Sequence, residues 1–177
     1  MSRWNHTHTA LQKAALELFV KHGYAATSTA AIAKRAGVTE MTLFRHFPTK
    51  AALVLADPFD PVIADAVRSR PLSESPLQAL IAAIRASWGQ LPPEAVAELQ
   101  LRLGILVEAG VAPENTETIA VLAAALIERG VTPAAAQVAS TAVVAGLTAA
   151  LLEWAATSEP GALDDAISNA LDTLARQ

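Results

Sequence analysis

Residues 29–47 of this chain, TAAIAKRAGVTEMTLFRHF, constrain its fold more tightly than any other stretch. Their apolar residues recur at spacings of three and four, which is the periodicity of a helix packed by one face. Gly37 interrupts this pattern, and glycine adopts the positive φ that ends a helix at little cost. Thr39 follows, and threonine caps helix starts well. The stretch therefore predicts two short helices packed across a tight turn, which is a helix-turn-helix.

The inward side chains of this motif leave a distinct outer face. The residues assigned to its turn and core are Ala33, Gly37, Val38, Leu43 and Phe47. The outward side chains of the second helix are polar or flexible, namely Glu40, Met41, Thr42, Arg45 and His46, and Lys50 follows them. Such a face combines groups that read base edges with groups that bind phosphates, as a helix in the major groove of DNA requires. The alternative is an ordinary helical hairpin, in which a glycine cap is also common.

The charges of the chain are unevenly distributed. Residues 1–50 carry seven Lys and Arg against two acids, whereas residues 51–177 carry six against fifteen, although the net charge is −4. This asymmetry indicates a polyanion-binding N-terminal part on an anionic remainder. A chance excess on a solvated helix face is the alternative.

The remainder of the chain has a helical pattern. Apolar residues at spacings of three and four alternate with Pro, Gly, Ser and Thr, and no stretch shows the alternation of a sheet. Ser75-Pro76, Thr132-Pro133 and Asp60-Pro61 are predicted helix starts, and Gly110, Gly130 and Gly161 are predicted ends. We expect an all-α protein of nine or ten helices, with a three-helix domain over residues 1–57 and a second helical domain over 58–177.

One segment without charge needs separate consideration. Residues 134–152 are nearly long enough to cross a bilayer, but they are rich in Ala with Gln, Ser and Thr interspersed. No basic cluster flanks them, as membrane topology signals would require. We interpret them as a buried helix whose small residues allow another helix to approach closely.

The motif also carries a family resemblance. The run LELFVKHGYAATSTAAIAKRAGVTEMTLFRHFPTKAAL, residues 16–53, resembles the DNA-binding domain of the TetR family of bacterial transcriptional regulators. The matching marks are "LF…GY…T", "IA…AGV", "TLF.HF" and the lysine after them. The resemblance implies a homodimer that binds a palindromic operator, represses transcription and is released by a small molecule in the C-terminal domain.

Site residues follow from this resemblance by position. Glu40, Met41 and Arg45 occupy base-reading positions, although Arg45 reaches either a guanine or a phosphate. The positions that contact the DNA backbone are occupied by Thr29, Thr42, Phe44, His46 and Lys50. Phe44 departs from the usual tyrosine, and so it keeps the packing but lacks the hydroxyl for a phosphate. A second departure is the DPFDP sequence at residues 57–61, which predicts a break in the fourth helix.

The C-terminal half supplies candidate dimer and ligand surfaces. Small and apolar side chains on its last two helices are assigned to the dimer interface, namely Ala142, Gly146, Ala149, Leu163, Ile167 and Leu171. The alternative is that these stripes cover the monomer's own core. Candidate walls of a pocket for an apolar ligand are Arg85, Trp88, Arg102 and Ile105, although such residues are more often core or surface.

Other classes of function find little support. The chain has no Cys, no glycine-rich phosphate loop, no nucleophile elbow and no HExxH motif, so we expect neither an enzyme nor a cofactor. His6 and His8 form an HxH pair in an N-terminal arm that we expect to be mobile, and without a third ligand they indicate no metal site. No signal peptide is apparent, which favours a cytoplasmic protein. A helical protein-interaction module that has lost operator binding is the rival interpretation.

Overall fold

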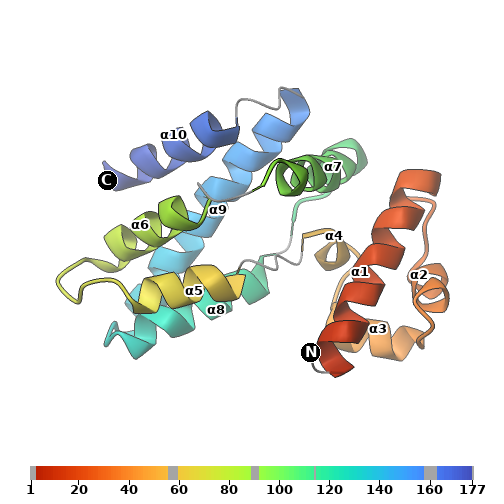
Figure 1. Ribbon diagram of the computed structural model, residues 1–177, viewed down its shortest axis with the longest axis horizontal. Helices are drawn as coiled ribbons and strands as arrows, with labels where there is room; N and C mark the ends of the chain where they lie inside the picture. Colours follow the sequence, from red (N-terminus) through yellow and green to blue (C-terminus); the bar gives the residue numbers. More distant parts are fainter. Residues whose placement is uncertain (1–2, 56–59, 89–91, 114, 158–162, 177) are drawn as a thin grey trace. The chain divides into compact units, whose positions relative to one another are not determined.

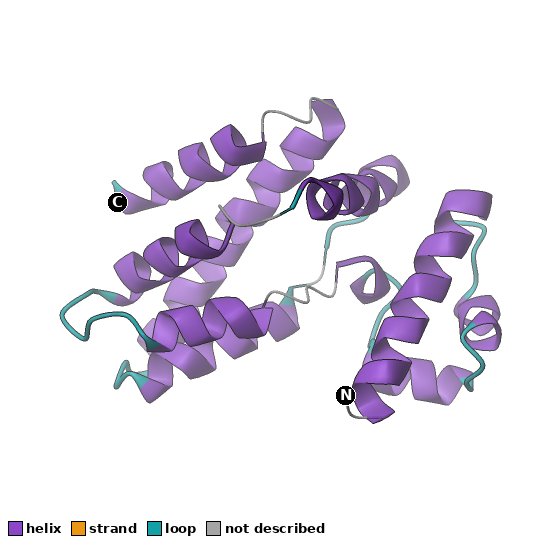
Figure 2. Ribbon diagram, viewed as in Figure 1, coloured by secondary structure: helices purple, strands orange, loops and turns teal. Residues whose placement is uncertain are grey.

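The computed structural model describes residues 3–55, 60–88, 92–113, 115–157 and 163–176, and these residues form helices and short connections without a strand (Figures 1 and 2). The ten helices are α1 (Arg3–His22), α2 (Thr29–Arg35), α3 (Glu40–His46), α4 (Ala52–Leu55), α5 (Asp60–Arg68), α6 (Pro76–Trp88), α7 (Pro93–Ala109), α8 (Thr116–Glu128), α9 (Pro133–Thr157) and α10 (Leu163–Ala175). The predicted all-α fold is confirmed.

The helices form two compact units. The first, here called the head, comprises Met1–Ala56 together with Leu101–Glu114, and the second, here called the body, comprises Asp57–Gln100 and Asn115–Gln177. The C-terminal part of α7 thus belongs to the head, which the sequence pattern did not predict. The proposed domain boundary at residue 57 lies outside the described residues.

The head has its own hydrophobic core. Helix α1 packs against α2 and α4, and α2 packs against α3. The buried side chains of this core are Leu11, Ala14, Ala15, Phe19, Ile32, Ala33, Leu43, Phe47, Leu53, Val54, Ile105 and Leu106. Burial of such side chains is the main favourable contribution to folding. Because α7 delivers Ile105 into this core, Ile105 stabilises the head and is not free to line a ligand pocket in the body.

Helices begin and end mainly where local sequence signals predict. At the start of α6, the Gln78 N–H donates to Ser75 Oγ at 3.3 Å, and the Ser75 N–H donates to Gln78 Oε1 at 2.9 Å. This reciprocal pair is a capping box, with Pro76 in the first helical position. Gly110 and Gly130 have positive φ after α7 and α8, as predicted, whereas Gly161 lies outside the described residues.

One helix is described before the DPFDP sequence and another from its second aspartate onward. Helix α4 ends at Leu55 and α5 begins at Asp60. The predicted break at Pro58 itself lies outside the described residues. Pro61 occupies the first turn of α5, where its missing N–H would have no intrahelical partner.

The body is built around α9. This helix packs against α6, α8 and α10, while α5 packs against α6 and α8. Arg68 Nε donates to Glu128 Oε2 at 2.6 Å and joins α5 to α8, and Arg85 forms an ion pair with Asp172 that joins α6 to α10. These pairs are exposed, so each adds little stability, and apolar burial provides most of the cohesion.

The contact between α9 and α10 corrects the predicted dimer interface. Leu163, Ile167 and Leu171 are at most 4% exposed within the single chain, because α10 turns its apolar stripe toward the body's own core. A Cβ on Gly146 would lie 3.1 Å from a methyl of Leu174. The helix that approaches Gly146 closely is therefore the chain's own α10. Ala142 and Ala149 are the members of the predicted set that remain exposed, and Gly146 is partly buried.

Helix α9 is also long and apolar enough to cross a membrane by length and composition alone. The core helix of a soluble protein satisfies the same criterion, so the feature is weak evidence for a membrane span. In the body, α9 buries Ser140, Val143, Leu147 and Trp154 among other side chains of one face.

Candidate nucleic-acid interface

The turn between α2 and α3 is a hydrogen-bonded corner. Gly37 has φ +72°, and its N–H donates to Lys34 O at 3.2 Å, while the Val38 N–H donates to Ala33 O at 3.0 Å. This pair of bonds is the Schellman motif, in which a residue of positive φ ends the helix. No atom lies within 4 Å of a Cβ built on Gly37, so the backbone conformation is the reason for glycine here.

The start of α3 is equally well defined. Thr39 has extended backbone geometry, and its Oγ1 accepts from the Thr42 N–H at 3.2 Å. The hydroxyls of Thr39 and Thr42 lie 2.9 Å apart and share a hydrogen bond. On the inner side, Leu43 and Phe47 are at most 1% exposed. The helix is therefore held by a cap at one end and by buried anchors along one face.

The outer face of α3 carries the predicted base-reading side chains. Met41 is 83% exposed, and Glu40 and Arg45 are also exposed. The Thr29 hydroxyl donates to the Glu40 carboxylate, which links the start of α2 to the start of α3. Thr29 was predicted to bind phosphate, but here its hydroxyl orients the carboxylate of a base-reading candidate. Phe44 is half-exposed beside this face.

His46 departs from the outward position that was predicted for it. Its side chain is only 6% exposed, and the Trp4 ring stacks on its imidazole with centroids 3.7 Å apart and planes at 26°. Nδ1 of His46 has no hydrogen-bond partner. Burial lowers the pKa of His46 from its ordinary value, and the nearby His8 and Arg45 lower it further. His46 therefore packs as part of the head, and the lowered pKa disfavours the charged form that would attract a phosphate.

We expect this burial to make the head less stable in acid. The pKa of His46 is lowered below 6.5 in the folded state. As the pH falls, the unfolded chain therefore binds a proton at His46 before the folded chain does. The contribution to stability is complete above the unfolded pKa and is lost as the pH falls through the folded pKa. Urea unfolding of wild type and His46→Phe at several pH values measures this effect. The free energy of unfolding should fall less in acid for the variant than for wild type. If the free energy of unfolding of both proteins depended on pH in the same way, the lowered pKa of His46 would be contradicted.

The ammonium group of Lys50 also forms contacts within the head. Its Nζ donates to Tyr24 O at 2.8 Å and to Thr27 O at 3.1 Å, and it lies 4.2 Å from the centroid of the Tyr24 ring. The ammonium thus binds two carbonyl oxygens of the connection between α1 and α2 and contacts the ring face. Two of its three N–H groups thus serve the fold, although the sequence places Lys50 at a predicted phosphate-contacting position.

From Arg3 onward the chain is helical, and the predicted mobile N-terminal arm is not found in these residues. His6 and His8 lie in α1, and the His8 ring packs 4.1 Å from the Phe47 ring, centroid to centroid. Trp4 is half-exposed at the start of the same helix. Sequence reasoning missed this packing, although Trp4 and His8 continue the stripe of Leu11 toward the N-terminus at helical spacing. No group of three or more His, Cys, Asp or Glu that could hold a metal occurs among the described residues.

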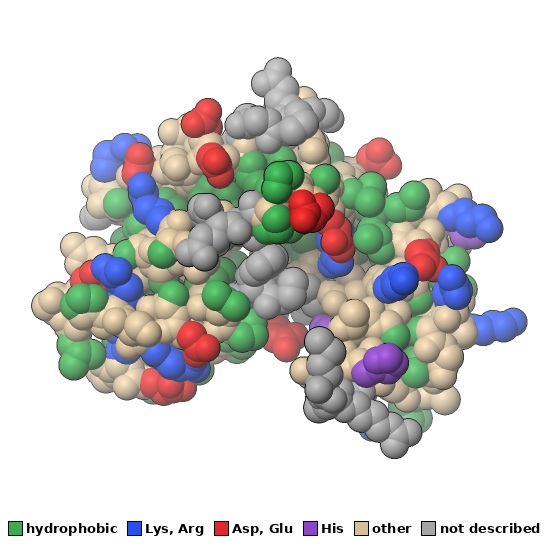
Figure 3. Space-filling view, viewed as in Figure 1, with side chains coloured by type: hydrophobic (Ala, Val, Ile, Leu, Met, Phe, Trp, Pro, Cys, Tyr) green, Lys and Arg blue, Asp and Glu red, His purple; other side chains and the backbone are tan. Residues whose placement is uncertain are grey.

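Cations flank this motif on the surface of the head. Lys13, Lys21 and Lys34 are exposed, and Lys and Arg side chains gather where α1 and α2 lie (Figure 3). Arg35 is paired with Glu17 at 2.7 Å, which neutralises part of this charge. The head is therefore a cationic support for α3, as expected of a surface that meets phosphates.

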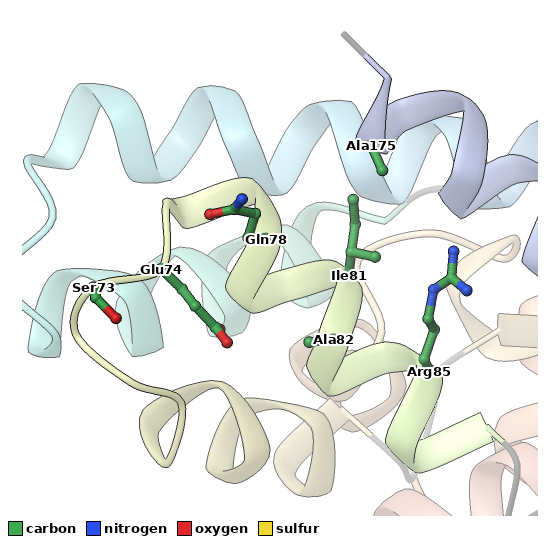
Figure 4. Close-up of a pocket in the computed structure, with 7 residues that line it drawn as sticks. All are labelled: Ser73, Glu74, Gln78, Ile81, Ala82, Arg85 and Ala175. Carbon is green, nitrogen blue, oxygen red and sulfur yellow. The ribbon is translucent and has the colours of Figure 1, made fainter.

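The predicted pocket residues serve other roles. Arg102 Nη1 donates to Val54 O at 3.3 Å inside the head, whereas Arg85 and Trp88 belong to the body. No single unit gathers the predicted set. The body has an open cleft of about 450 Å³ at its surface, lined by Ser73, Glu74, Gln78, Ile81, Ala82, Arg85 and Ala175 (Figure 4). Its two charged side chains already have partners, because Arg85 binds Asp172 and Glu74 binds Arg70.

Comparison with known proteins identifies the head. Residues 11–56 match the model of the bacterial regulatory proteins of the tetR family. A segment of 87 residues is 39% identical to the HTH-type transcriptional regulator TcmR of Streptomyces glaucescens, and it covers 48% of this chain and 38% of that protein. Residues 11–56 are therefore similar to the N-terminal DNA-binding domain of TetR-family regulators.

Other TetR proteins extend the similarity. A 50-residue segment is 48% identical to the uncharacterized regulator YvkB of Bacillus subtilis, covering 28% of this chain and 26% of that protein. The matched segments thus span less than two fifths of either curated relative. A TetR regulator from Rhodococcus sp. RHA1 superposes with a TM-score of 0.50 at 20% identity, over 98% of this chain and 97% of that one.

The structure of Thermus thermophilus FadR, a TetR-family repressor in complex with lauroyl-CoA, gives the same TM-score. Its identity is 23%, over 94% of this chain and 92% of that one. At these identities the structural likeness establishes a shared fold and nothing about ligands.

Proposed function

We propose that this protein is a transcriptional regulator of the TetR family, which binds a palindromic DNA operator as a homodimer and represses transcription until a small apolar molecule binds the body. The observation that carries this proposal is the exposed outer face of α3, formed by Glu40, Met41 and Arg45. A buried inner face and a capped start hold that helix on a cationic head. A cytoplasmic location, where the DNA lies, is part of the proposal.

Each exposed side chain has a natural partner on a base edge. A carboxylate accepts from the N4 amine of cytosine, a guanidinium donates to O6 and N7 of guanine, and an apolar side chain packs on the methyl of thymine. The Thr29 hydroxyl restrains the Glu40 carboxylate before DNA arrives, which lowers the entropy lost on binding.

Selection of bound sequences from a random DNA pool, followed by gel-shift measurements at two salt concentrations, tests the proposal. Specific binding should survive competitor DNA and weaken steeply as salt rises. Glu40→Ala should change the preference at one base pair per half-site by about tenfold, because one base contact discriminates by about 1–3 kcal/mol. Glu94→Ala, an exposed position on α7, is the matched control. Equal binding to competitor DNA would instead favour a protein-interaction module.

The proposed homodimer requires a surface on the body, and the exposed side of α9 is the best candidate. Residues 134–152 contain no charged side chain, and Val138 is 69% exposed among exposed alanines that include Ala142, Ala145 and Ala149. Small side chains allow two helices to pack closely. A two-fold axis through this face would pair the subunits and present two α3 helices to successive major grooves.

A charge on this face should weaken the dimer. Ala142→Glu would bury an unpaired carboxylate between subunits, and we expect the dimer dissociation constant to rise about tenfold. Sedimentation at a series of protein concentrations measures this constant. Ala97→Glu, an exposed alanine of α7, is the matched control and should leave it unchanged. Equal effects of both substitutions would exclude this face as the interface.

The ligand is the least constrained part of the proposal. The interior of the body is mainly aliphatic, which suits an apolar compound. Thermal-shift screening with apolar metabolites, followed by gel shifts with each compound that stabilises the protein, tests for release from DNA. A compound that stabilises the body and leaves operator binding unchanged would contradict the proposed role of the ligand.

A further inference from the structure

We infer that Trp4 is a positioning residue for DNA recognition, because its indole lies under Arg45 and is itself held by the buried His46. This inference rests on the proposed function, which assigns Arg45 to a guanine or a phosphate. It adds a residue of α1 to a recognition surface that the sequence placed almost entirely on α2 and α3.

The first step of the argument concerns what holds Trp4. Its ring stacks on the His46 imidazole with centroids 3.7 Å apart, and His46 is 6% exposed. Next to His46 in sequence, Phe47 is 1% exposed and contacts the His8 ring with centroids 4.1 Å apart. The indole therefore rests on a support that belongs to the core of the head, although Trp4 itself is 48% exposed.

The second step concerns what Trp4 holds. The guanidinium carbon of Arg45 lies over the Trp4 ring at 5.9 Å from its centroid. A guanidinium at this distance is attracted by the ring face, and tryptophan is the best of the aromatic partners. Arg45 is exposed, so without the ring its long side chain would sample many rotamers.

These two contacts connect the start of α1 to the outward cation of α3. A pre-oriented arginine loses less conformational freedom when it meets DNA, so the ring raises affinity without contacting the duplex. An exposed cation–π contact corresponds to about a two- to fivefold change in an equilibrium constant. We therefore expect Trp4→Ala to weaken operator binding two- to fivefold, in a manner that depends on Arg45.

A double-mutant cycle measures this dependence. Wild type, Trp4→Ala, Arg45→Ala and the double variant are compared in gel shifts with the selected operator, at a temperature where melting curves show all four folded. If Trp4 acts through Arg45, its removal has little further effect once Arg45 is alanine. Trp4→Phe should recover part of the loss, because a ring is restored. Val20→Ala, a 60% exposed position at the other end of α1, should bind as wild type does.

A second readout does not depend on DNA. NMR titration of the His46 ring in Trp4→Ala should show its pKa moving back toward the ordinary value, because removal of the indole readmits water to the imidazole. An unchanged His46 titration would show that the stack is absent in solution and would overturn the inference.

The outcomes separate this inference from the proposed function. If wild type selects an operator and the losses from Trp4→Ala and Arg45→Ala multiply, the inference fails and the function stands. If Arg45→Ala binds as wild type does, Arg45 has no recognition role and the inference fails with it. If wild type selects no DNA sequence, both are overturned.

Discussion

Replacing Leu43 by alanine is expected to lower the free energy of unfolding of the head by about 2–5 kcal/mol, the usual cost of removing a fully buried leucine. Leu43 is 0% exposed and packs among the side chains that join α1, α2 and α3. The cavity left behind would not be refilled, because α3 is tied at its start by the Thr39 cap. Urea or thermal unfolding measures the change, and DNA binding should fall only through the loss of folded protein.

Met41→Ala provides the matched control on the same helix. Met41 is 83% exposed, so its truncation should change the unfolding free energy by less than about 0.5 kcal/mol. It should alter operator preference instead, because its apolar side chain faces outward where a thymine methyl would lie. The two positions are two residues apart, and their variants distinguish the effect of the inner face of α3 on stability from the effect of its outer face on operator preference. Similar melting temperatures for both would contradict the burial of Leu43.

Features determined by neighbouring residues were predicted well from sequence. The corner at Gly37 depends on hydrogen bonds to Ala33 and Lys34, which lie within one helical turn. The cap at Thr39 depends on the amide of Thr42. Helix periodicity depends on spacings of three and four. Each of these signals is contained in a short window, and so the all-α fold and the helix-turn-helix follow from the amino-acid sequence alone.

Features determined by distant segments were not predicted. His46 was placed outward because periodicity shows which residues share a face, but it does not show that Trp4 from α1 covers that face. Leu163 and Gly146 were assigned to a dimer because an apolar stripe does not reveal whether its partner belongs to the same chain. Ile105 was assigned to a ligand pocket because no signal in the neighbouring sequence indicates that the C-terminal part of α7 packs in the core of the head.

Lys50 is the clearest example of a polar side chain whose role depends on such contacts. We expect Lys50→Ala to lower the free energy of unfolding of the head by about 2–3 kcal/mol. Its ammonium makes two charge-assisted bonds, to Tyr24 O at 2.8 Å and Thr27 O at 3.1 Å, and contacts the Tyr24 ring. Each such bond contributes about 1.5–3 kcal/mol when buried, and the partial exposure of Lys50 reduces this. Urea unfolding measures the loss, and Lys34→Ala is the control because Lys34 is exposed.

DNA binding distinguishes this structural role from a phosphate contact. A lysine that neutralises a phosphate adds about one to the slope of log K against log salt, whereas a lysine that supports the fold does not. At a temperature where Lys50→Ala is folded, we therefore expect its salt slope to equal that of wild type. If Lys50→Ala had a salt slope smaller by about one and an unchanged free energy of unfolding, Lys50 would instead contact a phosphate of the DNA. The carbonyl oxygens of Tyr24 and Thr27 would then need another donor, and water at the surface of the head is the simplest one.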